Sequence, residues 1–175
     1  MSLRTAEQQA ERLFEKFGNG SVPIDVDEVA ARLGVPVVYD DLGTEDVSGL
    51  LVSNEDGACI FIQKGDHPNR QRFSVAHEIA HFVLGHQKEA GEHVHVDRGH
   101  FISWRDPRSA AGVDPKEMEA NRFAAVLLMP ASLVKEKVST MVLGPLLDQH
   151  VRKLAQEFEV SEQAMTIRLT KLGLL

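Results

Sequence analysis

Apolar side chains recur every three or four positions along much of the chain, a spacing typical of amphipathic helices. These stretches are residues 5–17, 25–33, 68–84, 115–129, 131–138, 146–158 and 161–172. Shorter apolar segments at 37–39, 49–52 and 58–63 predict strands, and the Asp56-Gly57 pair before the last one favours a hairpin turn. The pattern therefore predicts a mostly helical α+β fold with a small mixed or antiparallel sheet next to the helix at 68–84.

The length of 175 residues suits one substantial core with small additions. We expect residues 1–140 to form the main domain and residues 141–175 to form a C-terminal helix pair packed on it. Ser161 is suited to cap the last helix, so the pair resembles a helix-turn-helix unit.

Basic side chains in this helix pair raise the question of DNA binding. Four of them could contact phosphate: Arg152, Lys153, Arg168 and Lys171. The acidic residues Glu157, Glu159 and Glu162 lie among them. We therefore expect core packing or partner docking, and not direct DNA binding, for these helices.

The segment His77-Glu78-Ile79-Ala80-His81 follows the HExxH pattern within a helix that is apolar on nearly every side. Residues four apart share one helix face, so both imidazoles can bind one metal ion. Glu78 can then reach a water molecule at that metal and act as a general base. Burying these three side chains without partners would be costly, and a metal ion satisfies all of them. The alternative is a pair of core histidines that hydrogen-bond the backbone.

A third ligand is expected from elsewhere, because a catalytic zinc usually takes three protein ligands and leaves a fourth position to water. Asp114 is suited to cap the helix at 115–129. Glu117 and Asn121 share a face of that helix, so Glu117 can bind the metal while Asn121 hydrogen-bonds a ligand. Glu117 could instead complete a capping box with Asp114, in which case Glu119 would be the ligand.

Three segments together resemble the ImmA/IrrE family of metallopeptidases: residues 70–81, 117–125 and 127–130. The resemblance extends from about Pro23 to the C-terminus. It implies a zincin-like single domain in which His77, His81 and Glu117 are the metal ligands and Glu78 is the general base. The Glu-x-x-x-Asn spacing is similar to the Glu-x-x-x-Asp of thermolysin-like enzymes, so Asn121 would have an uncharged supporting role.

The resemblance also implies an activity, because members of this family are zinc-dependent endopeptidases that cleave helix-turn-helix repressors. The expected partner is therefore a small Xre-like repressor, often phage-like or from a mobile element, whose cleavage relieves repression. Zinc would activate water and polarise the scissile carbonyl, while Glu78 would move a proton from the water to the leaving nitrogen. Manganese or another divalent ion could replace zinc.

Two other functions are compatible with the same residues. One is a metal-containing transcription regulator that binds DNA through its C-terminal helix pair. The other is a noncatalytic module that binds a repressor without cutting it. The presence of Glu78 argues against both, because binding alone has no use for a general base.

The order of the elements bears on substrate binding. The predicted sheet comes directly before the helix at 68–84, and a peptide can add itself to a sheet edge as an extended strand. We expect one of the predicted strands to flank the cleft; the alternative is a fully paired strand with no substrate role.

Between residues 87 and 113 no helical or strand spacing is evident, which predicts a long loop that covers the cleft or recognises substrate. His93 and His95 are spaced like a chelating pair, but no acid or thiol accompanies them at a telling distance, so a solvated loop is favoured. His86 is expected to cap the last carbonyls of the preceding helix.

Composition indicates which partners and which cellular compartment suit the protein. A net charge of −7 gives no support to nonspecific nucleic-acid binding. The single cysteine, Cys59, excludes an internal disulfide, suits a reducing compartment and is expected to pack within a strand. We find no signal segment and no apolar run of membrane-spanning length, so a cytoplasmic protein without membrane contact is expected.

Overall fold

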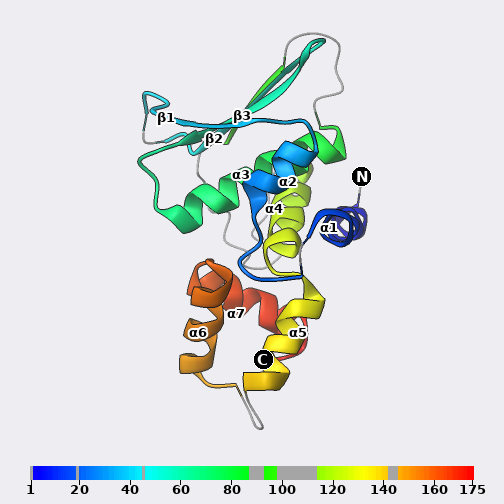
Figure 1. Ribbon diagram of the computed structural model, residues 1–175, viewed down its shortest axis with the longest axis vertical. Helices are drawn as coiled ribbons and strands as arrows, with labels where there is room; N and C mark the ends of the chain where they lie inside the picture. Colours follow the sequence, from blue (N-terminus) through cyan, green and yellow to red (C-terminus); the bar gives the residue numbers. More distant parts are fainter. Residues whose placement is uncertain (1, 19, 45, 87–92, 98–113, 142–145) are drawn as a thin grey trace.

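The computed structural model describes residues 2–18, 20–44, 46–86, 93–97, 114–141 and 146–175. Its helices are α1 (Leu3–Phe17), α2 (Val26–Arg32), α3 (Pro68–Leu84), α4 (Pro115–Leu128), α5 (Ala131–Met141), α6 (Asp148–Phe158) and α7 (Glu162–Lys171). Its strands are β1 (Val37–Asp40), β2 (Gly49–Asn54), β3 (Gly57–Gln63) and β4 (His93–Asp97). The mostly helical α+β fold with a small sheet is confirmed (Figure 1).

Local side-chain chemistry explains where the helices begin and end. The carboxylate of Asp25 accepts the backbone N–H of Glu28 at 2.9 Å, which caps α2. Ser161 accepts the N–H of Ala164 at 3.1 Å and caps α7 in the same way. Gly85 ends α3 with φ at 67°, a left-handed conformation that glycine adopts without steric cost.

The sheet has the strand order β1-β3-β2-β4. β1 is parallel to β3, whereas β2 is antiparallel to both β3 and β4. The hairpin between β2 and β3 is present, but its two turn residues are Glu55 and Asp56, because Gly57 already pairs with Asn54. The side chain of Asn54 accepts the N–H groups of both Asp56 and Gly57, which holds this turn one residue earlier than expected.

Strand β4 corrects one prediction. It lies within 87–113, a stretch expected to be a loop, and pairs with β2 from His93 opposite Ser53 to Asp97 opposite Gly49. The signal was a five-residue alternation of polar and valine side chains, which is too short to stand out without its partner strand. Residues 87–92 and 98–113 lie outside the described residues, so the predicted role of that stretch in covering the cleft stays a prediction.

Helix α3 packs against the sheet on one side and against α4 on the other (Figure 1). Every side chain from residue 74 to residue 81 of α3 is buried, and α4 is buried continuously from residue 123 to residue 128. Because both helices are enclosed, polar groups on their facing sides must be satisfied by one another or by a ligand. None of the described helices is both long and apolar enough to cross a membrane.

The C-terminal helices share this core. Four of their apolar side chains are fully buried: Leu154 and Phe158 of α6, and Met165 and Leu169 of α7. Arg168 of α7 donates from Nε to the carbonyl oxygen of Met129 at 2.8 Å, which joins α7 to the end of α4. Helices α5, α6 and α7 lie together at the end of the molecule opposite the sheet (Figure 1).

Candidate metal centre

Three side chains that could bind a metal ion converge from α3 and α4: His77, His81 and Glu117. His77 and His81 lie one turn apart on α3, and their Nε2 atoms are 3.0 Å apart. Glu117, in the first turn of α4, has one carboxylate oxygen 3.2 Å from His77 Nε2 and the other 3.4 Å from His81 Nε2. Among the described residues, these three form the group of histidine and acidic side chains that could hold a metal ion.

The spacing of these atoms fits zinc. Ligand atoms bound to a tetrahedral zinc ion at about 2.0–2.1 Å are about 3.3 Å from one another. The separations between the two ring nitrogens and the carboxylate oxygens, 3.0 to 3.4 Å, have this size. The histidine side chains are 3% and 1% exposed and that of Glu117 is 27% exposed, so the cluster is accessible to solvent on the Glu117 side.

Polar side chains contact the Nδ1 atoms of both imidazoles, on the side of each ring away from the cluster. Asn121 Oδ1 lies 3.1 Å from His77 Nδ1, and because a carbonyl oxygen only accepts, it favours the tautomer with the proton on Nδ1. That tautomer leaves the Nε2 lone pair of His77 directed at the centre of the cluster. Such outer contacts fix ring orientation in metal sites and raise the basicity of the ligand.

His81 is oriented by a chain of two further residues. Its Nδ1 lies 3.1 Å from His86 Nδ1, and His86 Nε2 lies 3.2 Å from Glu119 Oε2. Burial lowers the pKa of His86, with the hydrogen bond to Glu119 acting in the opposite direction, so the neutral ring is favoured. A neutral His86 that donates to Glu119 accepts from His81 Nδ1, which leaves Nε2 of His81 unprotonated for a metal.

Glu78, the acid of the HExxH motif, is fully buried between α3 and the sheet. A Cβ atom at Gly49 would lie 3.1 Å from its Oε1, so the first residue of β2 has to be small where it passes the carboxylate. β2 is hydrogen-bonded to a neighbour on each side, and β4 is the outer strand beside it. The strand expected to flank the site is therefore next to Glu78 but fully paired.

Residues 30–170 match the family described as the IrrE N-terminal-like domain, Peptidase_M78. The chain belongs to this family. The cluster of His77, His81 and Glu117 is a potential metal site within the matched residues.

Among solved structures, a Mycobacterium tuberculosis transcriptional regulator is similar to this chain, with a TM-score of 0.61 and 19% sequence identity. The similarity covers 97% of this chain and 47% of that one, so the chain spans about half the length of the regulator. At this identity the likeness shows a shared fold. No curated protein matches by sequence.

For this IrrE-like domain, sequence reasoning missed two features that the structure adds to the site. The first is the ring of His86, which contacts His81. The backbone N–H of His86 also donates to the His81 carbonyl at 3.1 Å, as expected of a residue at the helix end. Glu119, weighed as an alternative ligand, contacts His86, whereas Glu117 contacts the histidine pair. The second missed feature is Gly49, whose lack of a side chain matters only because β2 passes Glu78.

The basic residues of the C-terminal helix pair differ in their exposure and in their contacts. Arg168 is 7% exposed and donates to the backbone carbonyl of Met129, so it is not available to a DNA phosphate, in line with the core packing expected for these helices. Arg152 lies 3.4 Å from Glu162, and Lys153 is exposed. His93 and His95 lie on β4, but the idea that they chelate a metal concerns side chains outside the described part of the chain.

Proposed function

We propose that this protein is a zinc-dependent endopeptidase that cleaves a helix-turn-helix transcriptional repressor and thereby relieves repression. The observation that carries the proposal is the meeting of two imidazoles and one carboxylate from separate helices at the spacing of zinc ligands. The acid of the same HExxH motif, Glu78, is retained and buried beside them. Membership of a peptidase family supports this interpretation.

Bound zinc would supply Lewis-acid activation of water and of the scissile carbonyl. The residues of the chain would supply the rest. His77 and His81, held in the Nδ1-protonated tautomer by Asn121 and His86, present unprotonated Nε2 atoms. Glu78 takes a proton on a carboxylate oxygen as the water attacks, and then donates it to the nitrogen of the leaving peptide.

The sheet offers a route for the substrate backbone. Glu78 lies against Gly49, and Gly49 pairs with Asp97 of the outer strand β4. A peptide that adds to β4 as an extended strand would lie two strand spacings, about 10 Å, from β2, held by main-chain hydrogen bonds. The choice of a helix-turn-helix repressor as substrate rests on the family resemblance of residues 70–81 and 117–130.

The test uses small helix-turn-helix repressors encoded beside the gene of this protein. Each is incubated with the zinc-loaded wild-type protein, with Glu78→Gln and with Glu136→Gln, a matched change at an exposed glutamate of α5. We expect the wild-type protein and Glu136→Gln to produce the same two fragments, defined by mass spectrometry. We expect Glu78→Gln to keep its zinc and to leave the repressor intact, because an amide cannot carry the proton.

Other outcomes would replace the proposal. A stable complex with an intact repressor after long incubation would favour the noncatalytic binding module. A sequence-dependent gel shift at physiological salt, without cleavage, would favour the metal-containing regulator. Cleavage by Glu78→Gln at the parental rate would contradict the assigned role of Glu78.

A further inference from the structure

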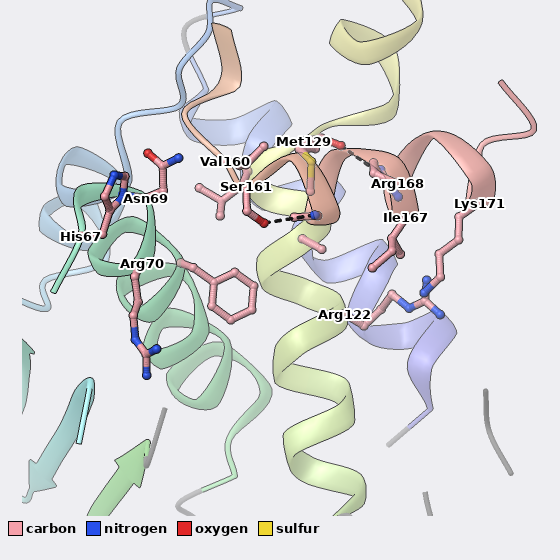
Figure 2. Close-up of a pocket in the computed structure, with 14 residues that line it drawn as sticks. His67, Asn69, Arg70, Arg122, Met129, Val160, Ser161, Ile167, Arg168 and Lys171 are labelled. Carbon is pink, nitrogen blue, oxygen red and sulfur yellow. Dashed lines mark hydrogen bonds between the residues drawn. The ribbon is translucent and has the colours of Figure 1, made fainter. Parts of the chain in front are cut away.

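A cavity of about 320 Å³ lies outside the metal cluster, between the start of α3, the second half of α4 and α7 (Figure 2). Apolar side chains from all three elements form much of its wall, among them Phe73, Leu128, Ala164 and Ile167. Cavities of this size that combine an apolar wall with a few polar groups are typical of small-molecule sites. The mechanism proposed above makes no use of this cavity.

One of the polar groups that line the cavity is a buried cation. Arg168 is 7% exposed, and its Nε donates to the Met129 carbonyl. Its Nη2 atom is also buried, and within the described ranges of the chain it has no hydrogen-bond acceptor. Because a buried charged donor without an acceptor is unfavourable, an anionic group inside the cavity would stabilise this arginine.

Two further cations lie on the same side of the cavity. Figure 2 shows the side chains of Arg122 and Lys171 next to each other, from α4 and α7. Arg122 pairs with Glu7 of α1 at 3.3 Å. Burial, followed by repulsion from Arg122, lowers the pKa of Lys171 to about 8. Three cationic side chains therefore gather where the cavity meets α7, a distribution that favours a negative charge.

The opposite side of the cavity does not carry the same charge. Arg70 lines it, but Figure 2 shows its guanidinium turned away. Its Nε donates to Ser48 at 2.7 Å and lies 3.1 Å from Asp66, so this guanidinium contacts residues near the ends of β2 and β3 and not the cavity. Charge at one end and apolar surface along the rest would suit a ligand with one anionic head and an apolar body.

We propose that this cavity binds a small amphipathic monocarboxylate, with its carboxylate at Arg168, Lys171 and Arg122 and its apolar body against Phe73 and Ile167. A carboxylate offers two acceptor oxygens, which matches a planar guanidinium and a neighbouring ammonium. The proposal is independent of the proposed peptidase activity, because it concerns different residues and a different readout.

The test is calorimetric titration of the zinc-loaded full chain with octanoate, and with 1-octanol as a probe of similar shape without charge. We expect octanoate to bind at one site and 1-octanol to bind at least about tenfold more weakly, since charge-assisted hydrogen bonds are lost. Equal affinity for the two probes, or no binding of octanoate at millimolar concentration, would overturn the proposal.

Variants locate the site. Lys171→Gln should weaken octanoate binding about tenfold, whereas Lys153→Gln, the same change at an exposed lysine of α6, should leave it unchanged. Ala164→Leu should weaken both probes by filling the cavity. Arg168→Met should abolish the preference for octanoate; if that variant fails to fold, Lys171→Gln and Ala164→Leu still decide. An equal effect of Lys153→Gln and Lys171→Gln would contradict the assignment.

The pH dependence gives a separate check. Lys171 faces Arg122 of α4, Glu7 of α1 and Arg168 of its own helix, and of these groups it is the one whose pKa lies near 8. Octanoate affinity should therefore fall as the pH rises through about 8, where Lys171 loses its proton. The fall should be absent in Lys171→Gln. Glu78→Gln should bind octanoate like the wild-type protein, so a failure of either proposal can be distinguished from a failure of the other.

Discussion

Replacement of Asn121 by alanine tests whether the residues behind the histidines tune the metal site. The change removes the acceptor 3.1 Å from His77 Nδ1 and leaves all three proposed ligands in place. Loss of such an outer contact typically weakens metal binding 10- to 100-fold, or about 1.4–2.7 kcal/mol. We therefore expect Asn121→Ala to bind zinc within that range of reduced affinity.

The same loss should appear in zinc-dependent stability. At a free zinc concentration about 1,000 times the dissociation constant, binding stabilises the native state by about 4.1 kcal/mol. For Asn121→Ala at the same free zinc concentration, that increment falls to about 2.7 kcal/mol if affinity drops tenfold, and to about 1.4 kcal/mol if it drops a hundredfold. The metal-free protein should lose only about 1 kcal/mol, the net contribution of one hydrogen bond.

The assay combines zinc competition against a chromophoric chelator with urea unfolding at buffered zinc concentrations. Gln156→Ala is the matched control, because it removes an amide from an exposed position of α6. A metal-free Asn121→Ala protein that is strongly destabilised, but whose zinc increment equals that of the wild-type protein, would refute the reasoning. It would mean that Asn121 supports the fold of α4 and not the metal ligand.

Three further substitutions test the surroundings of the site and the C-terminal helices. Gly49→Ala places a Cβ atom 3.1 Å from Glu78 Oε1, so proteolysis should fall about 10- to 100-fold while zinc affinity, measured by competition, is unchanged. Phe158→Ala removes a side chain that is 0% exposed and should cost about 3–5 kcal/mol in urea unfolding, with a single transition. Ser161→Ala removes the cap of α7 and should cost about 1 kcal/mol in the same assay.

Each of these expectations has a contrary result. Loss of zinc from Gly49→Ala would mean that β2 supports the metal ligands and not only Glu78. Two separate unfolding transitions for Phe158→Ala would mean that the C-terminal helices form an independent unit. An unchanged unfolding free energy for Ser161→Ala would show that the hydrogen bond to Ala164 contributes nothing net.

The helices could be predicted from the sequence because their signals are local. Asp25 and Ser161 cap helices whose apolar spacing is visible in the sequence, and Gly85 ends α3 directly after the predicted stretch 68–84. The convergence of Glu117 with the histidine pair needed the family resemblance as well. Spacing alone left both Glu117 and Glu119 open as ligands, since each lies on the same predicted helix.

Features that depend on contacts between distant segments could not be predicted in this way. β4 has five residues and pairs with a strand about forty positions earlier, so its alternation is clear only beside β2. The contact of His86 with His81 depends on the left-handed turn at Gly85. The sequence offers Arg168 as one of four cations that could contact phosphate, and only the packing of α7 against the end of α4 shows that it is buried.

X-ray diffraction from zinc-loaded crystals, recorded at the zinc absorption edge, tests the central claim most directly. We expect one strong anomalous peak from a zinc ion bonded to His77 Nε2, His81 Nε2 and Glu117, with a fourth position taken by solvent and Glu78 directed toward that solvent. A zinc ion bound elsewhere in the chain, or one whose four positions are all filled by protein side chains, would contradict it.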